Sequence, residues 1–333
     1  MAEIAHIVDS ALREQLVDRQ RTVEQEIGRV GRTPDLDGLL TEVQGALGRV
    51  ANGTFGICET CHDPIETDRL IADPLVRFCL DHLSASEQRA LERDLDLAAR
   101  IQRGLLPTAD VRMFGWDISY RYQPAGVVSG DYCDYVVTDS GDLYFMVGDV
   151  SGKGVAASML MSHLHAAFHT LIPLNLPLGH MMKTASGLFC ESALPAQYAT
   201  LVCGRASRAG ELEITNAGHP PPLLITRQGV TRIDATGLPI GMFHNENFDV
   251  THLRLGPDDT LLMYTDGVVE AEDGEGHEYG TQRFAGVAVE ALNLELPALV
   301  HACLTDLAGF RSGTTRSDDV TLVALRRNRF AEE

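Results

Sequence analysis

From about residue 115 onward, the sequence alternates short apolar runs of β character with turns rich in glycine and aspartate. The runs with this character are DISYRYQ, DLYFMVGDV, QYATLVCG, ELEITNAG, PPLLIT, DVTHLRL, DTLLMYTDG and DVTLVALRR. Helical periodicity interrupts them in four blocks, namely 155–172, 178–194, 281–292 and 297–309. So many strands with so few helices between them favour an α+β sandwich over a doubly wound parallel sheet.

The residues before this β-rich part are helical in pattern. Residues 9–30 place apolar side chains at helical spacing, and Thr33-Pro34 begins a second apolar-periodic segment. Because the turn between them is so short, the two helices run antiparallel as a hairpin, and neither could bury its apolar stripe alone. A third helical block covers 84–106, and Pro107 marks the boundary of the β-rich domain. We therefore expect a helical hairpin, a cysteine-containing module, a linker helix and a large domain over 1–52, 53–83, 84–107 and 108–333.

The composition suits a folded protein and excludes several functions. Of the 333 residues, 44% are hydrophobic and 22% charged, and 27 Lys+Arg against 47 Asp+Glu give a formal charge of −20. Such acidity disfavours direct binding to nucleic acid or to anionic membranes, and it suits divalent cations wherever carboxylates converge. No apolar run approaches the 18 residues of a membrane span, and the N-terminus lacks a signal peptide, so we expect a cytoplasmic protein.

The seven cysteines fall into two groups. Four are scattered through apolar surroundings and are expected to be reduced core residues: Cys133, Cys190, Cys203 and Cys303. The others form the pattern Cys58-x2-Cys61 and Cys79-x2-His82, with seventeen residues between the pairs. Paired ligands at matched spacing are typical of a tetrahedral zinc site, and four protein ligands make it structural. The alternative is three reduced cysteines near an unrelated histidine.

The stretch ALGRVANGTFGICETCHDPIETDRLIADPLVRFCLDH resembles the zinc finger of the DksA/TraR family. With the preceding hairpin, the resemblance covers about residues 10–83, and it assigns the finger to 53–83. His82 stands where the family usually has cysteine, and it still satisfies zinc. Family members that act in the RNA polymerase secondary channel carry an acidic D-x-x-D-x-A tip, which Asp35-Leu36-Asp37 does not reproduce. Binding to RNA polymerase through the finger is the alternative function, and the missing acidic tip counts against it.

Four aspartate motifs recur in the β-rich part, each expected at the end of a strand. They are Gly130-Asp131, the run from Gly148-Asp149 to Gly154, Thr265-Asp266-Gly267, and Asp318-Asp319. Carboxylates gathered from several strand ends suit Mg²⁺ or Mn²⁺ rather than zinc. For any single motif, the alternative is that Asp-Gly merely marks a turn.

In this order the motifs resemble the metal-dependent protein phosphatases of the type 2C (PPM) class, in the SpoIIE/RsbU-like branch. The resemblance spans about 92–327 and includes LAARIQRGLLP, SGDYCD, GDVSGKGVAA, NAGHPPPL, GLPIG, YTDGVVEA and SDDVTLV. It implies a four-layer αββα sandwich over 108–333. It also implies two Mn²⁺ or Mg²⁺ ions that activate a water for attack on a phosphoserine or phosphothreonine.

The resemblance further implies residue roles. Asp149 would bridge the two ions, and the Val150 carbonyl would complete one site. Three carboxylates would supply the remaining ligands: Asp131, Asp266 and Asp318. Other polar residues near these motifs have either a supporting or a purely structural role: Asp134, Asp319, Lys153 and His219.

The implied function is dephosphorylation of a STAS-domain anti-sigma factor antagonist by a serine/threonine phosphatase, under control of the zinc module. A catalytically inactive scaffold is the remaining alternative. A homodimer is also expected, because the linker helix places apolar residues in a coiled-coil seam with Gln102 as its polar layer. The seam consists of Leu91, Leu95, Ala98 and Leu105. The alternative is an amphipathic helix packed on its own domain.

Overall fold

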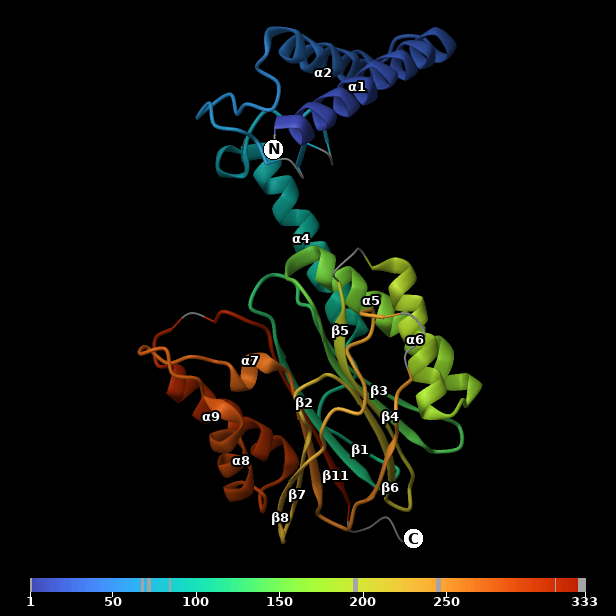
Figure 1. The fold of residues 1–333 in the computed structure, drawn as a ribbon, viewed down its shortest axis with the longest axis vertical. Helices are drawn as coiled ribbons and strands as arrows, with labels where there is room; N and C mark the ends of the chain where they lie inside the picture. The colour runs from blue at the N-terminus through green and yellow to red at the C-terminus, as the bar shows by residue number, and fades with distance from the viewer. Residues whose placement is uncertain are drawn as a thin grey trace. The chain divides into compact units, whose positions relative to one another are not determined.

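The computed structural model describes residues 2–66, 69–70, 73–83, 85–193, 197–243, 247–314 and 316–328. The chain divides into two compact units, residues 1–94 and 95–333 (Figure 1). The division falls within helix α4 (Ala85–Leu105), not at Pro107, because the second half of α4 belongs to the larger unit.

The smaller unit consists of a helical hairpin and a cysteine-containing module. Helices α1 (Ala2–Val30) and α2 (Pro34–Asn52) pack against each other. The Thr33 hydroxyl accepts a hydrogen bond from the Leu36 N–H at 3.3 Å, which caps α2, and Gly53 ends it in the left-handed conformation. A single 3₁₀ turn, η1 (Leu80–His82), follows in the cysteine-containing module.

Two antiparallel sheets form the centre of the larger unit. The six-stranded sheet has the order β1 (Val111–Met113), β2 (Trp116–Gln123), β11 (Val320–Arg327), β10 (Thr260–Tyr264), β7 (Leu223–Thr226) and β8 (Gly229–Arg232). The five-stranded sheet has the order β3 (Asp131–Val137), β4 (Leu143–Val150), β5 (Ala199–Ala206), β6 (Glu211–Ala217) and β9 (Thr251–Arg254).

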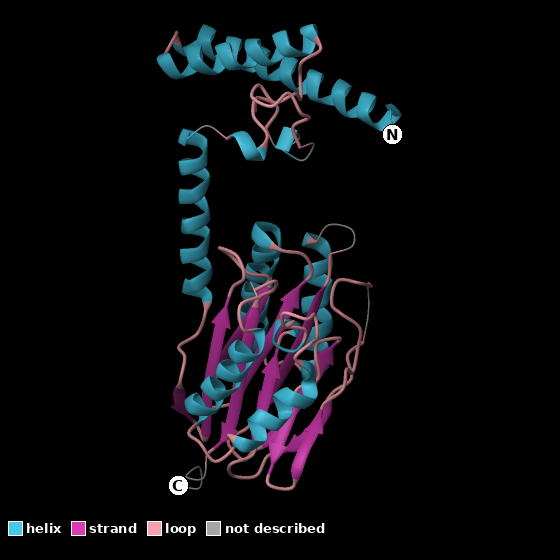
Figure 2. Ribbon diagram, turned by 90° about the vertical axis from the view of Figure 1, so that its left-hand side faces the viewer, coloured by secondary structure: helices cyan, strands magenta, loops and turns pink. Residues whose placement is uncertain are grey.

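Helices cover the outer face of each sheet. On the five-stranded sheet lie α5 (Gly154–Leu171), η2 (Ile172–Leu174) and α6 (Leu178–Ser192). On the six-stranded sheet lie α8 (Gly280–Glu290) and α9 (Leu296–Arg311), which cross in front of the strands in Figure 2. Three buried clusters fill the two helix–sheet layers and the space between the sheets. The predicted αββα sandwich is therefore confirmed.

Strand β3 was not among the predicted β runs. Its first four residues, Asp131 to Asp134, are all buried, but the two aspartates interrupt the continuous apolar run that is typical of a buried strand. The short elements β1, β8 and α7 (Asp266–Val269) were also missed. Among the scattered cysteines, Cys190 is partly exposed and is not the core residue that we expected, whereas the other three are buried.

The expectation that no segment is apolar enough to span a membrane was wrong for Gly154–Leu174. By length and composition alone, this helical segment passes as a candidate span. Half of it is buried inside the fold, where α5 packs on β3 and β4. Its apolar character is thus accounted for by the core of the larger unit.

Candidate functional site

The antiparallel strand order brings the four predicted aspartates to one edge of the sandwich. Asp131 begins β3 and faces Asp149 near the end of β4 in the strand register. Asp266 follows β10, and Asp318 lies just before β11, the antiparallel neighbour of β10. Asp131 thus stands at the start of its strand and Asp318 precedes its own, contrary to our expectation that each aspartate lies at the end of a strand. They still meet the other two, because in an antiparallel pair one strand starts where its neighbour ends.

Asp131 joins the two sheets through a buried polar network. One oxygen of its carboxylate, Oδ2, accepts hydrogen bonds from the hydroxyls of Thr265, at 3.0 Å, which directly follows β10, and of Thr321 on β11. The residue is only 1% exposed. Burial and the neighbouring Asp149 raise the pKa of this carboxyl well above its ordinary value, and the two hydroxyls partly oppose the shift.

Asp149 lies at the centre of the negative charge. Burial, followed by the charges of Asp266 and Asp318, raises the pKa of its carboxyl to about 8. Burial and Asp318 likewise raise the pKa of Asp266. A group of carboxylates with raised pKa values holds its negative charge at a cost in free energy, which a hard divalent cation would relieve. The donor set therefore fits Mg²⁺ or Mn²⁺.

Glycine at position 130 lets the β3 edge approach this charge. A Cβ added at Gly130 would lie 2.9 Å from the Val150 carbonyl oxygen and 3.2 Å from Asp149 Oδ1. The Val150 side chain is fully buried, and its N–H donates to the Gly130 carbonyl at 3.2 Å. The β3 edge thus packs directly against the Val150 carbonyl and the Asp149 carboxylate.

Asp318 and Asp319 differ in their contacts. The Asp318 carboxylate lies 3.1 Å from the Lys153 ammonium, which also donates to the Ser317 carbonyl at 2.7 Å. Asp319 instead accepts hydrogen bonds from the backbone N–H groups of Ala125, at 2.7 Å, and Gly130, at 3.0 Å. Asp319 therefore supports the loop that carries Asp131, and Lys153 connects the Asp149 loop to Asp318.

Two further sequence candidates do not reach the carboxylates. Asp134 and Tyr132 lie on the face of β3 that packs against α5, whereas Asp131 and Cys133 face the other sheet. Of the two roles that the sequence left open for Asp134, the face it occupies favours a role away from the carboxylates. His219 is buried, and its Nδ1 lies 2.9 Å from the hydroxyl of Thr200, the residue opposite Asp149 on β5. Burial lowers the pKa of His219 to about 3, so it is neutral.

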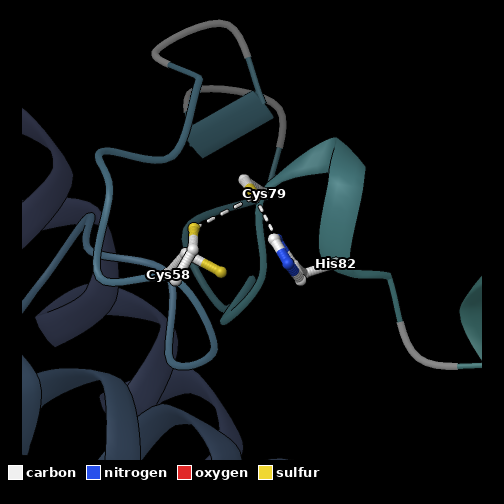
Figure 3. A group of neighbouring side chains, drawn as sticks. Cys58, Cys79 and His82 are labelled. Carbon is white, nitrogen blue, oxygen red and sulfur yellow. Dashed lines mark hydrogen bonds between the residues drawn. The ribbon is translucent and has the colours of Figure 1, made fainter.

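The four expected zinc ligands converge in the smaller unit. The ligand atoms of Cys58, Cys61, Cys79 and His82 all lie within 4.8 Å of one another. In Figure 3 the side chains of Cys58, Cys79 and His82 point toward a common centre. The Cys61 and Cys79 sulfurs are 3.8 Å apart. Thiolates at about 2.3 Å from a tetrahedral ion would be separated by about 3.8 Å, so this pair fits zinc.

The electrostatics of this module also favour a thiolate ligand. Burial raises the pKa of the Cys58 thiol, but surrounding backbone N–H groups, those of Cys61 and Cys79 first, outweigh burial and lower the pKa to about 6. His62, which breaks the paired spacing, is exposed and has a left-handed backbone. The described residues therefore bring His82, not His62, to the three sulfurs.

Sequence reasoning assigned Gln102 to the wrong surface. Its side chain is 4% exposed, and its amide makes two hydrogen bonds with the backbone of Ser129, at 2.6 and 3.0 Å. The Ser129 hydroxyl in turn accepts from the Asp131 N–H at 3.1 Å. Gln102 therefore connects α4 to the Asp131 loop and is not a polar layer between two paired helices.

Known proteins are similar to both the smaller and the larger unit of this chain. The curated relatives include protein IcfG of Synechocystis sp., 27% identical over 71% of this chain and 42% of its own length. Phosphoserine phosphatase RsbP of Bacillus subtilis is 30% identical over 54% of this chain and 46% of its own length. The chain thus spans less than half the length of these two relatives.

Among solved structures, the SiaA-PP2C domain of Pseudomonas aeruginosa shares the fold, with a TM-score of 0.65 and 22% identity. The match covers 74% of this chain and 99% of that domain. The model of the prokaryotic DksA/TraR C4-type zinc finger matches residues 53–81. The model of stage II sporulation protein E (SpoIIE) matches residues 139–328, which include Asp149, Asp266 and Asp318. Because the SpoIIE match covers more than half of the residues of this chain, the chain belongs to the SpoIIE family. It has a PP2C-type phosphatase domain preceded by a DksA/TraR-type zinc finger.

Proposed function

We propose that this chain is a cytoplasmic, metal-dependent protein serine/threonine phosphatase with two Mn²⁺ or Mg²⁺ ions at the carboxylate edge. The observation that carries the proposal is the convergence of Asp131, Asp149, Asp266 and Asp318 where the two sheets meet. Membership of the SpoIIE family and a relative named as a phosphoserine phosphatase support the same activity.

Each residue then has a defined task. Asp149 would be the ligand shared by the two ions, the Val150 carbonyl would complete one site, and the remaining three aspartates would supply the other carboxylate ligands. When bound, the two ions lower the pKa of a shared water and neutralise charge on the phosphoryl group. Thr265 and Thr321 hold Asp131 in one rotamer through their hydroxyls. No side chain has to act as a covalent nucleophile, and burial raises the pKa of the nearby Cys133 thiol, which keeps it protonated.

We further propose that the substrate is a phosphorylated STAS-domain anti-sigma factor antagonist, so that dephosphorylation switches its binding partner. The support is family membership alone, since fold and family do not by themselves define a substrate. Phosphate release from phosphoserine-STAS proteins, with and without Mn²⁺, tests the activity and the substrate together. A small aryl phosphate included as a second substrate separates the two claims.

Matched variants make this assay specific. Asp149→Asn should abolish Mn²⁺-dependent turnover, whereas Asp139→Asn, at the exposed far end of the same hairpin, should retain it. Turnover of the aryl phosphate without turnover of any phospho-STAS protein would reject the substrate but not the activity. Absence of turnover on both in Mn²⁺ would favour the inactive scaffold.

For the smaller unit we propose one structural zinc ion, held by Cys58, Cys61, Cys79 and His82. A small module of this kind has little apolar core besides the metal. Its buried cluster contains Leu12, Cys58, Ile65, Leu70 and Cys79. Two of these five residues are ligands, so the cluster should form only when the ion is bound.

We also propose that the chain forms a homodimer through α4 and that this pairing regulates the phosphatase. The exposed apolar residues of this helix are Leu91, Leu97 and Ile101, at 44%, 49% and 59% exposure. They revise the expected seam, because its polar layer, Gln102, faces the larger unit instead. The hydrogen bonds of Gln102 with Ser129 offer a route from helix pairing to Asp131.

Light scattering and turnover test this proposal in parallel. Leu97→Glu should dissociate the dimer and change turnover, whereas Arg100→Glu, an exposed charged position on the same helix, should leave the dimer intact. A wild-type protein that is strictly monomeric at micromolar concentration would rule out regulation by pairing.

A further inference from the structure

A second group of metal-ligating side chains lies on the outer side of the five-stranded sheet. Asp134 comes from β3, and His165 and His169 come from successive turns of α5. Residues four apart on a helix face the same way, so both imidazoles point at the strand. One ligand atom from each of the three residues lies within 4.8 Å of the others.

The distances are those of a shared centre. Asp134 Oδ2 lies 3.1 Å from His165 Nδ1 and 2.8 Å from His169 Nε2, and the two imidazole rings are 4.1 Å apart. Nitrogen and oxygen ligands at about 2.0 to 2.2 Å from one ion are separated by about 3 Å or slightly more. Small side-chain rotations would thus place all three atoms around a single cation.

Hydrogen bonding alone leaves this group incomplete. His169 Nε2 is hydrogen-bonded to Asp134 Oδ2, whereas the buried His165 Nδ1 lies 3.1 Å from the same oxygen without forming a hydrogen bond. A buried nitrogen without a partner is uncommon in native proteins and calls for an explanation. A cation between the imidazoles and the carboxylate would supply it.

The surroundings of Asp134 resemble those of a metal-ligating carboxylate. Its other oxygen, Oδ1, accepts the Tyr135 N–H at 2.8 Å, and the Tyr132 hydroxyl lies 3.3 Å from Oδ2. Such secondary hydrogen bonds orient a carboxylate that binds a metal. Exposure of the side chains increases from 3% at Asp134 through 18% at His165 to 45% at His169. Solvent can therefore reach one side of the group and supply water ligands.

We propose that Asp134, His165 and His169 bind a divalent transition-metal ion of the Zn²⁺ class, with water completing the coordination. Two imidazoles and one carboxylate prefer such ions to Mg²⁺ or Ca²⁺, which take mainly oxygen ligands. This ion is additional to the cations at the carboxylate edge, since Asp134 and Asp131 lie on opposite faces of β3. It ties α5 to β3, and α5 begins directly after the Asp149 loop.

Zinc content after equilibrium dialysis tests the proposal on the full chain. All proteins carry Asp149→Asn, so that zinc binding at the carboxylate edge is weakened equally in each. In this background the parent should bind one zinc ion per chain more than the protein with His169→Gln. The matched control, His180→Gln, replaces another exposed helical histidine and should bind as much zinc as the parent.

The same proteins give a second readout through thermal unfolding. Added Zn²⁺ should raise the Tm of the parent and of His180→Gln more than that of His169→Gln, because binding to the native state stabilises it. Asp134→Asn should lose the same zinc ion; if it fails to fold, the exposed His169 variant still decides. Equal zinc content in the parent and His169→Gln would show that the group is only a hydrogen-bonded network. That result would overturn this site without affecting the proposed phosphatase activity.

Discussion

Replacing Asp149 by asparagine should stabilise the protein in buffer without added divalent cations. Burial, followed by the charges of the neighbouring carboxylates, raises the pKa of Asp149 from 3.8 to about 8. Between these two values the folded protein keeps a proton that the unfolded chain has released. The free energy of unfolding therefore falls as the pH rises through this window. Asparagine removes the titrating group and with it this contribution to the pH dependence.

The size of the effect follows from the same values. A pH of 7 lies about three units above the pKa of this carboxyl in the unfolded chain, and each unit corresponds to about 1.4 kcal/mol. Because the unfolded chain releases this proton at pH 7 and the folded protein keeps it, the free energy of unfolding is lower by about 4 kcal/mol. This is a ceiling, because neighbouring carboxyls titrate together with Asp149 and share the cost. We expect a gain of about 2 to 4 kcal/mol for Asp149→Asn at pH 7.

Urea unfolding between pH 5 and pH 8, followed by a probe in the larger unit, measures this gain. The advantage of the variant over wild type should grow with pH. Added Mn²⁺ should reverse the order, because it stabilises only the protein that binds it tightly. An Asp149→Asn protein that is no more stable than wild type at pH 8 would refute the electrostatic reasoning. Asp139→Asn, remote from the cluster, controls for a general effect of charge removal.

Three further changes test other contacts. Thr321→Val removes a hydroxyl from the buried Asp131 carboxylate and should cost about 1 to 3 kcal/mol in urea unfolding, with a higher Mn²⁺ requirement for turnover. Gly267→Ala would place a Cβ 1.9 Å from the Asp319 carbonyl oxygen, so Tm should fall sharply; an unchanged Tm would contradict the packing described. Cys58→Ser should remove a zinc ion whose binding contributes on the order of 10 kcal/mol to folding of the small module. Limited proteolysis should then cut residues 1–94 while the larger unit stays intact, and equal protease resistance with and without the substitution would argue against a structural zinc.

Local patterns in the sequence already indicated an α+β sandwich and the zinc ligands, and the family resemblance added the four-layer αββα arrangement. The strand runs after residue 115 predicted most of the observed strands, because short apolar runs bounded by turn residues are typical of strands buried on both faces. The paired spacing of the cysteines and His82 was equally informative, since each pair closes a short loop around one ion.

The aspartate motifs predicted which carboxylates to examine, but not how they meet. Asp131 and Asp149 face each other only because β3 and β4 pair in one register. The hydroxyls that hold Asp131 come from positions 265 and 321, more than 130 residues away in the sequence. No local pattern reveals such partners.

Tertiary structure alone decided the roles of Gln102 and Asp134. Gln102 fits a coiled-coil seam by its spacing, yet its amide is buried against Ser129 because that side of α4 packs on the larger unit. Asp134 lies three residues from Asp131 on β3 and so points to the opposite face, where α5 brings His165 and His169 to it. Which residues a side chain meets depends on strand register and helix packing, and those are properties of the folded chain.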